Sequence, residues 1–342
     1  MLRRYFRYGM FFGGVWLGLR VGRLGALANL LTNTMVSGRR QPFWRSPAEL
    51  GLEAEAVNFQ ASDGVTLRGW FIPRDGNNGT PAPAVVFVHG WPWNRMGNYV
   101  GNGVLADQTI DLLEPARALH DAGFHVLLFD LRNHGASDAA TPVTFGVKEA
   151  RDFVAAVQML RGRSEVDGER IGAIGYSMGA NTLIYGIPEV QPIRAAVAVQ
   201  PVRMETFADN VTQQFFGRLA PSLINIAEHL HESFGSPPLR SINPTSAATQ
   251  LGDTVMLYVQ GSGDTWGSLA DVQAMAAATP NALPVVVAPS HDRYSGYQYV
   301  NSHLSEIVDF FNEQLSEQAV QTTTTEQAMP KVQIYDSKNG NA

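Results

Sequence analysis

The stretch Ile171-Gly172-Ala173-Ile174-Gly175-Tyr176-Ser177-Met178-Gly179 decides the fold of this chain. Its second half fits the pattern G-x-S-x-G, in which a serine lies between two glycines where a strand turns sharply into a helix. The serine of such a turn has a strained backbone, so its neighbours must be small to let the chain fold back. The apolar run before Ser177 is typical of a strand, and residues 180–185 can continue as a helix. The turn therefore raises Ser177 above the sheet and points the N–H groups of the helix start toward negative charge beside it.

Length, charge and cysteine content exclude several classes of protein. The chain has 342 residues, of which 45% are hydrophobic and 16% charged, enough for one large domain or two small ones. A net charge of -6, without a dense basic stripe beyond the N-terminus, argues against a nucleic-acid partner. The absence of cysteine excludes a disulfide framework, a cysteine nucleophile and thiolate metal sites. We expect neither a cofactor nor a metal, since His229 and His231 are two residues apart and do not share a helical face.

Outward from the serine, strand-like runs alternate with helix-like segments over residues 52–315. Residues 56–60 and 66–72 flank Asp63-Gly64, which is a hairpin signal. The other strand-like runs are apolar throughout, and they are residues 84–88, 125–130, 171–174, 195–199, 255–259 and 283–287. Fully apolar strands that alternate with helices indicate a parallel sheet covered on both faces. We therefore predict an α/β fold with a mostly parallel, eight-stranded sheet, closed by a helix over residues 300–315.

Two segments of the domain depart from this alternation. Residues 203–253 form a connection far longer than the usual 2–6 residues, and their apolar residues recur at helical spacing. We interpret them as a helical lid that covers the serine; the alternative is a long helical crossover without contact to the site. Residues 316–342 are polar and threonine-rich, and we expect a disordered tail there.

Residues 1–45 differ in composition from the rest of the chain. Arg3, Arg4 and Arg7 precede an apolar run that Arg20 and Arg23 interrupt. As a membrane-spanning helix, the run would carry two arginines that together cost about 5–7 kcal/mol near the bilayer centre. A secretory signal, a helix lying in the membrane interface and a helix packed on the protein itself are the alternatives. We favour an uncleaved membrane anchor, which predicts that the protein is associated with a membrane. If the segment is not an anchor, we expect a cytoplasmic protein.

A serine nucleophile needs a base, and the base needs an orienting acid. In a parallel sheet, both should follow the carboxyl ends of strands. Asp264 follows the run 255–259 in a glycine-rich loop, and His291 follows the last strand-like run. His303, in the last predicted helix, is the alternative base, and Asp209 is the alternative acid.

The chain resembles an α/β-hydrolase over residues 52–315. The residues that carry the resemblance are His89-Gly90-Trp91, Asp130-Leu131-Arg132-Asn133-His134-Gly135-Ala136-Ser137, the turn at Gly175–Gly179, Asp264 and His291. The resemblance implies that Ser177 attacks an acyl carbonyl, His291 transfers the proton and Asp264 holds the imidazole. It also implies an oxyanion hole from the N–H groups of Met178 and Trp91.

The resemblance is greater to esterases and serine-aminopeptidase-like enzymes than to lipases, whose oxyanion loop usually reads H-G-G-G. We expect a serine hydrolase that cleaves a carboxylic ester or related acyl bond of a small molecule through an acyl-enzyme. A peptidase for short peptides and a non-catalytic binding protein are the alternatives. Trp93 and Trp266, on loops beside the catalytic positions, are candidates for the substrate pocket, although they could equally pack the lid.

Overall fold

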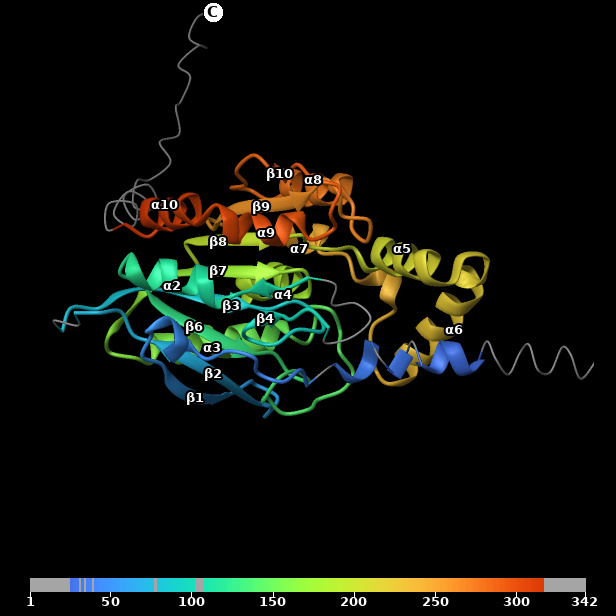
Figure 1. The fold of residues 1–342 in the computed structure, drawn as a ribbon, viewed down its shortest axis with the longest axis horizontal. Coiled ribbons are helices and arrows are strands. Elements are labelled where there is room, and N and C mark those ends of the chain that lie inside the picture. Colours follow the sequence, from blue (N-terminus) through green and yellow to red (C-terminus); the bar gives the residue numbers. More distant parts are fainter. Residues whose placement is uncertain are drawn as a thin grey trace, which may run out of the picture.

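The core of the molecule is an eight-stranded sheet with helices on both faces, seen in a computed structural model (Figure 1). The model describes residues 25–316, apart from residues 31, 34, 39, 77–78 and 102–107. The strands, in sheet order, are β1 (Glu55–Gln60), β2 (Thr66–Ile72), β6 (His125–Asp130), β3 (Ala82–Val88), β7 (Val166–Tyr176), β8 (Ala195–Val199), β9 (Val255–Gly261) and β10 (Val286–Ala288). β1 and β2 form the predicted hairpin, β2 is antiparallel to β6, and the other pairs are parallel. The predicted mostly parallel, eight-stranded sheet is confirmed.

Alternate side chains of the central strands enter two separate cores. In β6, Leu127 and Phe129 lie in one core, whereas Val126 and Leu128 lie in the other. This follows from the pleat, which points successive side chains to opposite faces. Because both faces are covered, both sets must be apolar, and burial of this surface is the main stabilising contribution.

Helices from different parts of the chain close the two cores. One face carries α2 (Leu113–Asp121), α9 (Ser295–Ser302) and α10 (Leu304–Gln314). The other carries α3 (Ala150–Arg161), α4 (Met178–Gly186), α7 (Thr245–Ala248) and α8 (Leu269–Ala278). A two-stranded ribbon of β4 (Gly97–Asn98) and β5 (Ile110–Asp111) lies outside the main sheet. Short 3-10 turns complete the chain, and they are η1 (Pro47–Leu50), η2 (Ile187–Glu189), η3 (Gly217–Leu219) and η4 (Leu239–Ser241).

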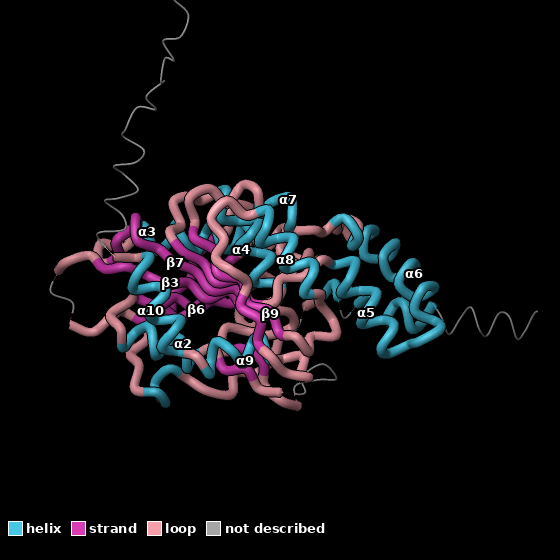
Figure 2. The backbone as a smooth tube through the Cα atoms, turned by 90° about the horizontal axis from the view of Figure 1, so that it is seen from above, coloured by secondary structure: helices cyan, strands magenta, loops and turns pink. Residues whose placement is uncertain are grey.

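The long connection between β8 and β9 is helical. Its principal helices, α5 (Met204–Phe216) and α6 (Ala220–Ser233), extend away from the sheet on the side to which the strands point (Figures 1 and 2). The helical residues between 25 and 37 lie beside α6, where the Thr32 hydroxyl donates to the carbonyl of Ala227 at 3.4 Å. The described residues 25–37 thus pack on the helical connection.

Two predicted elements differ from the structure. The helix expected over residues 300–315 is divided, because His303 is non-helical (φ -126°, ψ 45°) and separates α9 from α10. The last strand begins at Val286 rather than at residue 283. Leu283 donates from its N–H to Met256, but Pro284 has no N–H and interrupts the pairing.

Part of the predicted organisation lies outside the described residues, namely residues 1–24 of the N-terminal segment and residues 317–342 of the tail. Over the described part of the chain, no helix combines the length and apolar character needed to cross a bilayer.

Candidate active site

Ser177 lies at a tight turn between β7 and α4. Its φ of 51° and ψ of -113° are strained for a residue with a side chain. The glycines are required by close approach: a Cβ on Gly179 would lie 2.0 Å from the Val88 carbonyl oxygen, and one on Gly175 would lie 2.5 Å from the Gly179 carbonyl oxygen. The pattern G-x-S-x-G is therefore required because the turn has no room for side chains larger than glycine at these two positions.

The loop after β3 lies directly against the serine. A Cβ on Gly90 would be 3.4 Å from Ser177 Cβ. His89 fixes this loop, since its Nδ1 is hydrogen-bonded to the carbonyl of Gly90 at 2.8 Å and its Nε2 accepts from Leu131 N–H at 3.0 Å. Complete burial lowers the pKa of His89 to about 4, so the ring is neutral near pH 7. Trp91 follows Gly90 and Met178 begins α4, so both predicted oxyanion-hole residues adjoin Ser177 in the chain or in space.

A largely aromatic pocket opens above Ser177. Both predicted pocket tryptophans, Trp93 and Trp266, line it, and so do Trp91, Pro92, Phe145, Gln200, Val202, Met204, Phe207, Asp264, Gly267, Arg293, Tyr294 and Tyr297. Met204 and Phe207 come from α5, which means that the helical connection contacts the site. The Asn181 side chain bonds the main chain of Phe145 and Val202 and so holds two walls of the pocket together.

Asp264 is fixed in this pocket by three donors. Its Oδ1 accepts from Trp266 N–H at 3.0 Å, and its Oδ2 accepts from the amides of Gln200 at 3.0 Å and Gln260 at 3.1 Å. Burial raises the pKa of Asp264, and these hydrogen bonds oppose that shift. Asp264 is therefore held in a fixed position in the pocket that Ser177 also lines.

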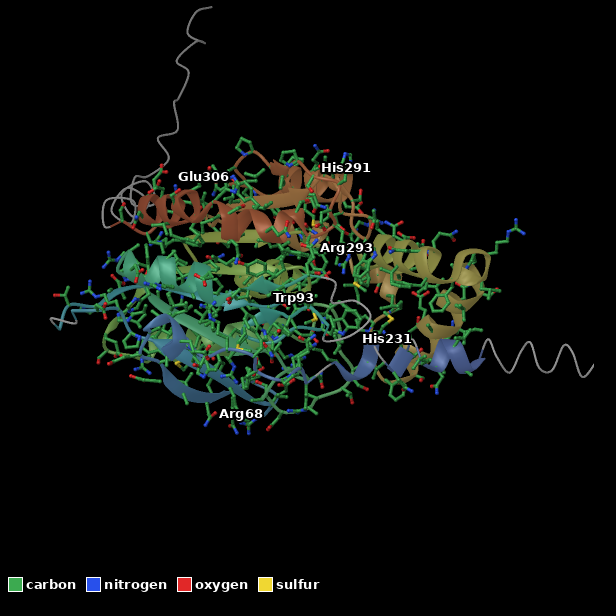
Figure 3. All side chains as sticks on the ribbon, viewed as in Figure 1. Arg68, Trp93, His231, His291, Arg293 and Glu306 are labelled. Carbon is green, nitrogen blue, oxygen red and sulfur yellow. The ribbon has the colours of Figure 1, made fainter. Side chains whose placement is uncertain are left out.

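His291 lies outside the pocket. Its main chain packs against the acid loop, because a Cβ on Gly263 would be 2.4 Å from the His291 carbonyl carbon. The imidazole, however, is exposed, and within the described part of the chain it makes no hydrogen bond or ion pair. In the view of Figure 3, Arg293 lies between His291 and Trp93. The structure thus brings Ser177 and Asp264 to one pocket and leaves the His291 side chain at the surface.

Tyr297 and Arg293 also line the pocket that holds Ser177 and Asp264. Burial raises the pKa of Tyr297 well above its usual range, and the nearby Ser177 side chain opposes that shift. Arg293 lies over the rings of Trp266 at 3.7 Å and Tyr294 at 3.9 Å. A tyrosine that keeps its proton at neutral pH is not a base for Ser177.

The alternative candidates lie away from the pocket. The His303 ring stacks on Tyr299 at the junction of α9 and α10. Asp209 is on the outer side of α5, 3.4 Å from Arg240. The described residues contain no group of three or more histidine, aspartate or glutamate side chains placed to hold a metal.

Sequence reasoning missed Gln200, Arg293 and Tyr297. Gln200 directly follows the carboxyl end of β8, so its polar side chain at that position was a usable signal. No comparable signal marks Tyr297, which lies within α9.

Comparison with known proteins identifies the family. Residues 85–328, more than half of the chain, match the model of the alpha/beta hydrolase family. The chain is 34% identical over 145 residues to the uncharacterized protein Rv2307c of Mycobacterium tuberculosis (strain ATCC 25618 / H37Rv), an alignment that covers 42% of this chain and 44% of that protein. It is 30% identical over 186 residues to the polyketide transferase ATR5 of Stachybotrys chlorohalonatus (strain IBT 40285), covering 54% of this chain and 55% of that one.

Among solved structures, the Pyrococcus furiosus esterase Pf2001 superposes with a TM-score of 0.61 and 25% identity, over 82% of this chain and 100% of the esterase. The chain spans less than half the length of the first curated relatives it matches. It belongs to the α/β-hydrolase family.

Proposed function

We propose that this protein is a serine hydrolase that cleaves a carboxylic ester, or a related acyl bond, through an acyl-enzyme intermediate. The observation that carries the proposal is the placement of Ser177, at a strained turn and at the base of an aromatic pocket, with the Asp264 carboxylate in the same pocket. The pocket suits an apolar acyl group. The polyketide transferase and the esterase named above are in keeping with an acyl substrate.

In this mechanism, the Ser177 hydroxyl attacks the acyl carbonyl carbon while His291 takes its proton. The N–H groups of Met178 and Trp91 stabilise the oxyanion of the tetrahedral intermediate. The intermediate collapses, the alcohol leaves with the proton from His291, and the acyl group remains on Ser177. Water then attacks the acyl-enzyme with His291 as base, which releases the acid and restores the serine.

This mechanism requires the loop after β10 to move. The main chain of His291 already packs against Gly263, the residue before Asp264, and we propose that a turn of residues 289–292 directs the imidazole inward. We propose that the turned-in imidazole reaches the Ser177 hydroxyl in the pocket that Tyr297 also lines. The active state then differs from the described one in this loop rather than in the sheet.

The test is turnover of nitrophenyl esters of increasing acyl-chain length, measured beside amino-acyl amides. We expect ester hydrolysis with a pre-steady-state burst of nitrophenolate, because the acyl-enzyme forms before it is hydrolysed. Ser177→Ala is the control and should abolish the burst. Faster turnover of the amides would favour the peptidase.

The exposed imidazole of His291 favours a second candidate, a protein that binds a ligand in the aromatic pocket without catalysis. This candidate predicts that folded protein hydrolyses neither esters nor amides, although apolar esters compete for the pocket and change the fluorescence of Trp93 and Trp266.

We further propose that residues 1–45 associate the protein with a membrane. The basic and apolar sequence supports this, as does Leu30, which is 65% exposed beside the helical connection. Removal of residues 1–24 leaves the described residues intact and should move the protein from the membrane fraction to the supernatant. Recovery of both forms in the supernatant would contradict the proposal.

A further inference from the structure

Gln200 connects the two loops that carry the proposed acid and base. Its side chain is 1% exposed and directly follows β8, the strand next to β7. One amide N–H donates to Asp264 Oδ2 at 3.0 Å, and the other donates to the carbonyl of Arg293 at 3.1 Å. The amide oxygen accepts from Gly296 N–H at 2.9 Å. A single buried amide therefore bonds both the loop after β9 and the segment after β10.

The backbone around Gln200 is built to admit this amide. Gln200 has a φ of 48°, which is a left-handed conformation that residues with a side chain rarely adopt. Its own N–H donates to the carbonyl of Val259 at 2.8 Å. A Cβ on Gly296 would lie only 2.3 Å from the Gln200 amide oxygen, and one on Gly261 would lie 3.0 Å from it. Strain maintained at a site, together with neighbours that leave space for one side chain, indicates a functional constraint.

The amide's contacts fix one end of the loop that carries His291. Arg293 and Gly296 lie on the C-terminal side of His291, and Gln200 bonds both. The junction of this loop with α9 is therefore held in place. The charged and titratable groups that face Asp264 are Arg293 and Tyr297. Because Gln200 is neutral, its hydrogen bond orients the Asp264 carboxylate without placing a charge beside it.

We propose that Gln200 is a positioning residue that holds the Asp264 carboxylate and the fixed end of the His291 loop in one geometry. The proposal rests on the serine-hydrolase function for its kinetic consequences only. Its structural content, the connection of two loops, can be measured without substrate.

Gln200→Met keeps the length of the side chain and removes all three hydrogen bonds. Hydrogen exchange followed by mass spectrometry should show faster exchange, by about tenfold or more, in both residues 261–267 and residues 293–297. The matched control is Gln191→Met. Gln191 also connects distant segments, through Leu251, Thr254 and Ile193, but it lies outside the pocket. Unchanged exchange in either loop of Gln200→Met would overturn the proposal, whether or not the protein hydrolyses esters.

The kinetic arm separates positioning from simple structural support. In Gln200→Met we expect kcat to fall about 10- to 100-fold, the scale of a misplaced catalytic group, with KM changed by less than about threefold. Gln200→Glu places a second carboxyl against Asp264, and the pair keeps a proton to higher pH because two adjacent carboxylates repel. The acidic limb of the pH profile of kcat/KM should therefore move to higher pH by about one unit.

An unchanged pH profile in Gln200→Glu, or equal losses in the Gln200 and Gln191 variants, would reduce Gln200 to a structural residue and overturn the proposal. If wild-type protein has no activity but the exchange of both loops responds to Gln200→Met, the hydrolase function fails while the connection stands.

Discussion

The loop after β9 and the loop after β10 lie side by side, yet their principal side chains have different environments. Asp264 accepts three hydrogen bonds in a buried pocket, whereas the His291 imidazole is exposed. The proposed nucleophile, oxyanion loop and acid are thus held in place, and the proposed base is not. The comparison locates the conformational step of the proposed mechanism in residues 289–292.

The largest expected effect concerns the base. Replacement His291→Ala should lower kcat/KM by about 10⁴-fold, because members of a triad act as a unit. His303→Ala is the control and should stay within about threefold of wild type, since His303 lies at the junction of α9 and α10. Steady-state kinetics on a nitrophenyl ester measures both. Near wild-type activity in His291→Ala would mean that His291 is not the base of the reaction.

The acid should respond almost as strongly. Asp264→Asn keeps the shape of the side chain but replaces an acceptor with a donor that faces the N–H groups already directed at it. A loss of roughly 10³- to 10⁴-fold in kcat is expected from the disturbed orientation of the imidazole. Asp209→Asn, on the outer side of α5, should change kcat by less than about twofold. Equal losses of kcat in Asp264→Asn and Asp209→Asn would contradict the proposal that Asp264 is the acid.

The turn that carries Ser177 has a strained backbone, and this strain can be measured. Ser177→Gly should raise the free energy of unfolding by about 1–3 kcal/mol, because glycine adopts a φ of 51° without a penalty. Ser177→Ala removes the same hydroxyl but keeps the strain, so it is the matched control. Denaturant unfolding of the two variants gives the difference. Equal stabilities would show that the turn is unstrained.

The buried histidines should make the stability of the protein depend on pH. Burial lowers the pKa of His89 and of His134 to about 4, below the value of about 6.5 in an unfolded chain. Between these values the unfolded chain binds protons that the folded chain does not, so stability is complete above pH 6.5 and declines toward pH 4.

His134→Gln should flatten this decline in Tm, because glutamine does not titrate. The variant should still fold, since the glutamine amide can donate to the Arg132 carbonyl that His134 contacts. A decline of Tm in His134→Gln that is as steep as in the wild type would contradict this account.

Sequence patterns predicted the sheet because its strands are apolar throughout, and burial on both faces requires this. They predicted Ser177 and Asp264 because a turn without room for side chains demands glycine and because parallel strands end at one edge. They could not predict the environment of His291. Its orientation depends on side-chain contacts of a loop, and no periodicity records these.

The same limit applies to the break at His303 and to the position of Tyr297 in the pocket. Gln200 is the intermediate case, since its strand-end position was visible in the sequence but its three partners were not.

The central claim is that Ser177 is a nucleophile that His291 activates when its loop turns inward. Reaction with a fluorophosphonate, followed by intact-mass and peptide mass spectrometry, tests it without knowledge of the substrate. We predict one adduct per chain on Ser177, none in Ser177→Ala, and a labelling rate at least about 10³-fold lower in His291→Ala. No adduct on folded protein, or equal labelling rates for wild type and His291→Ala, would contradict the account.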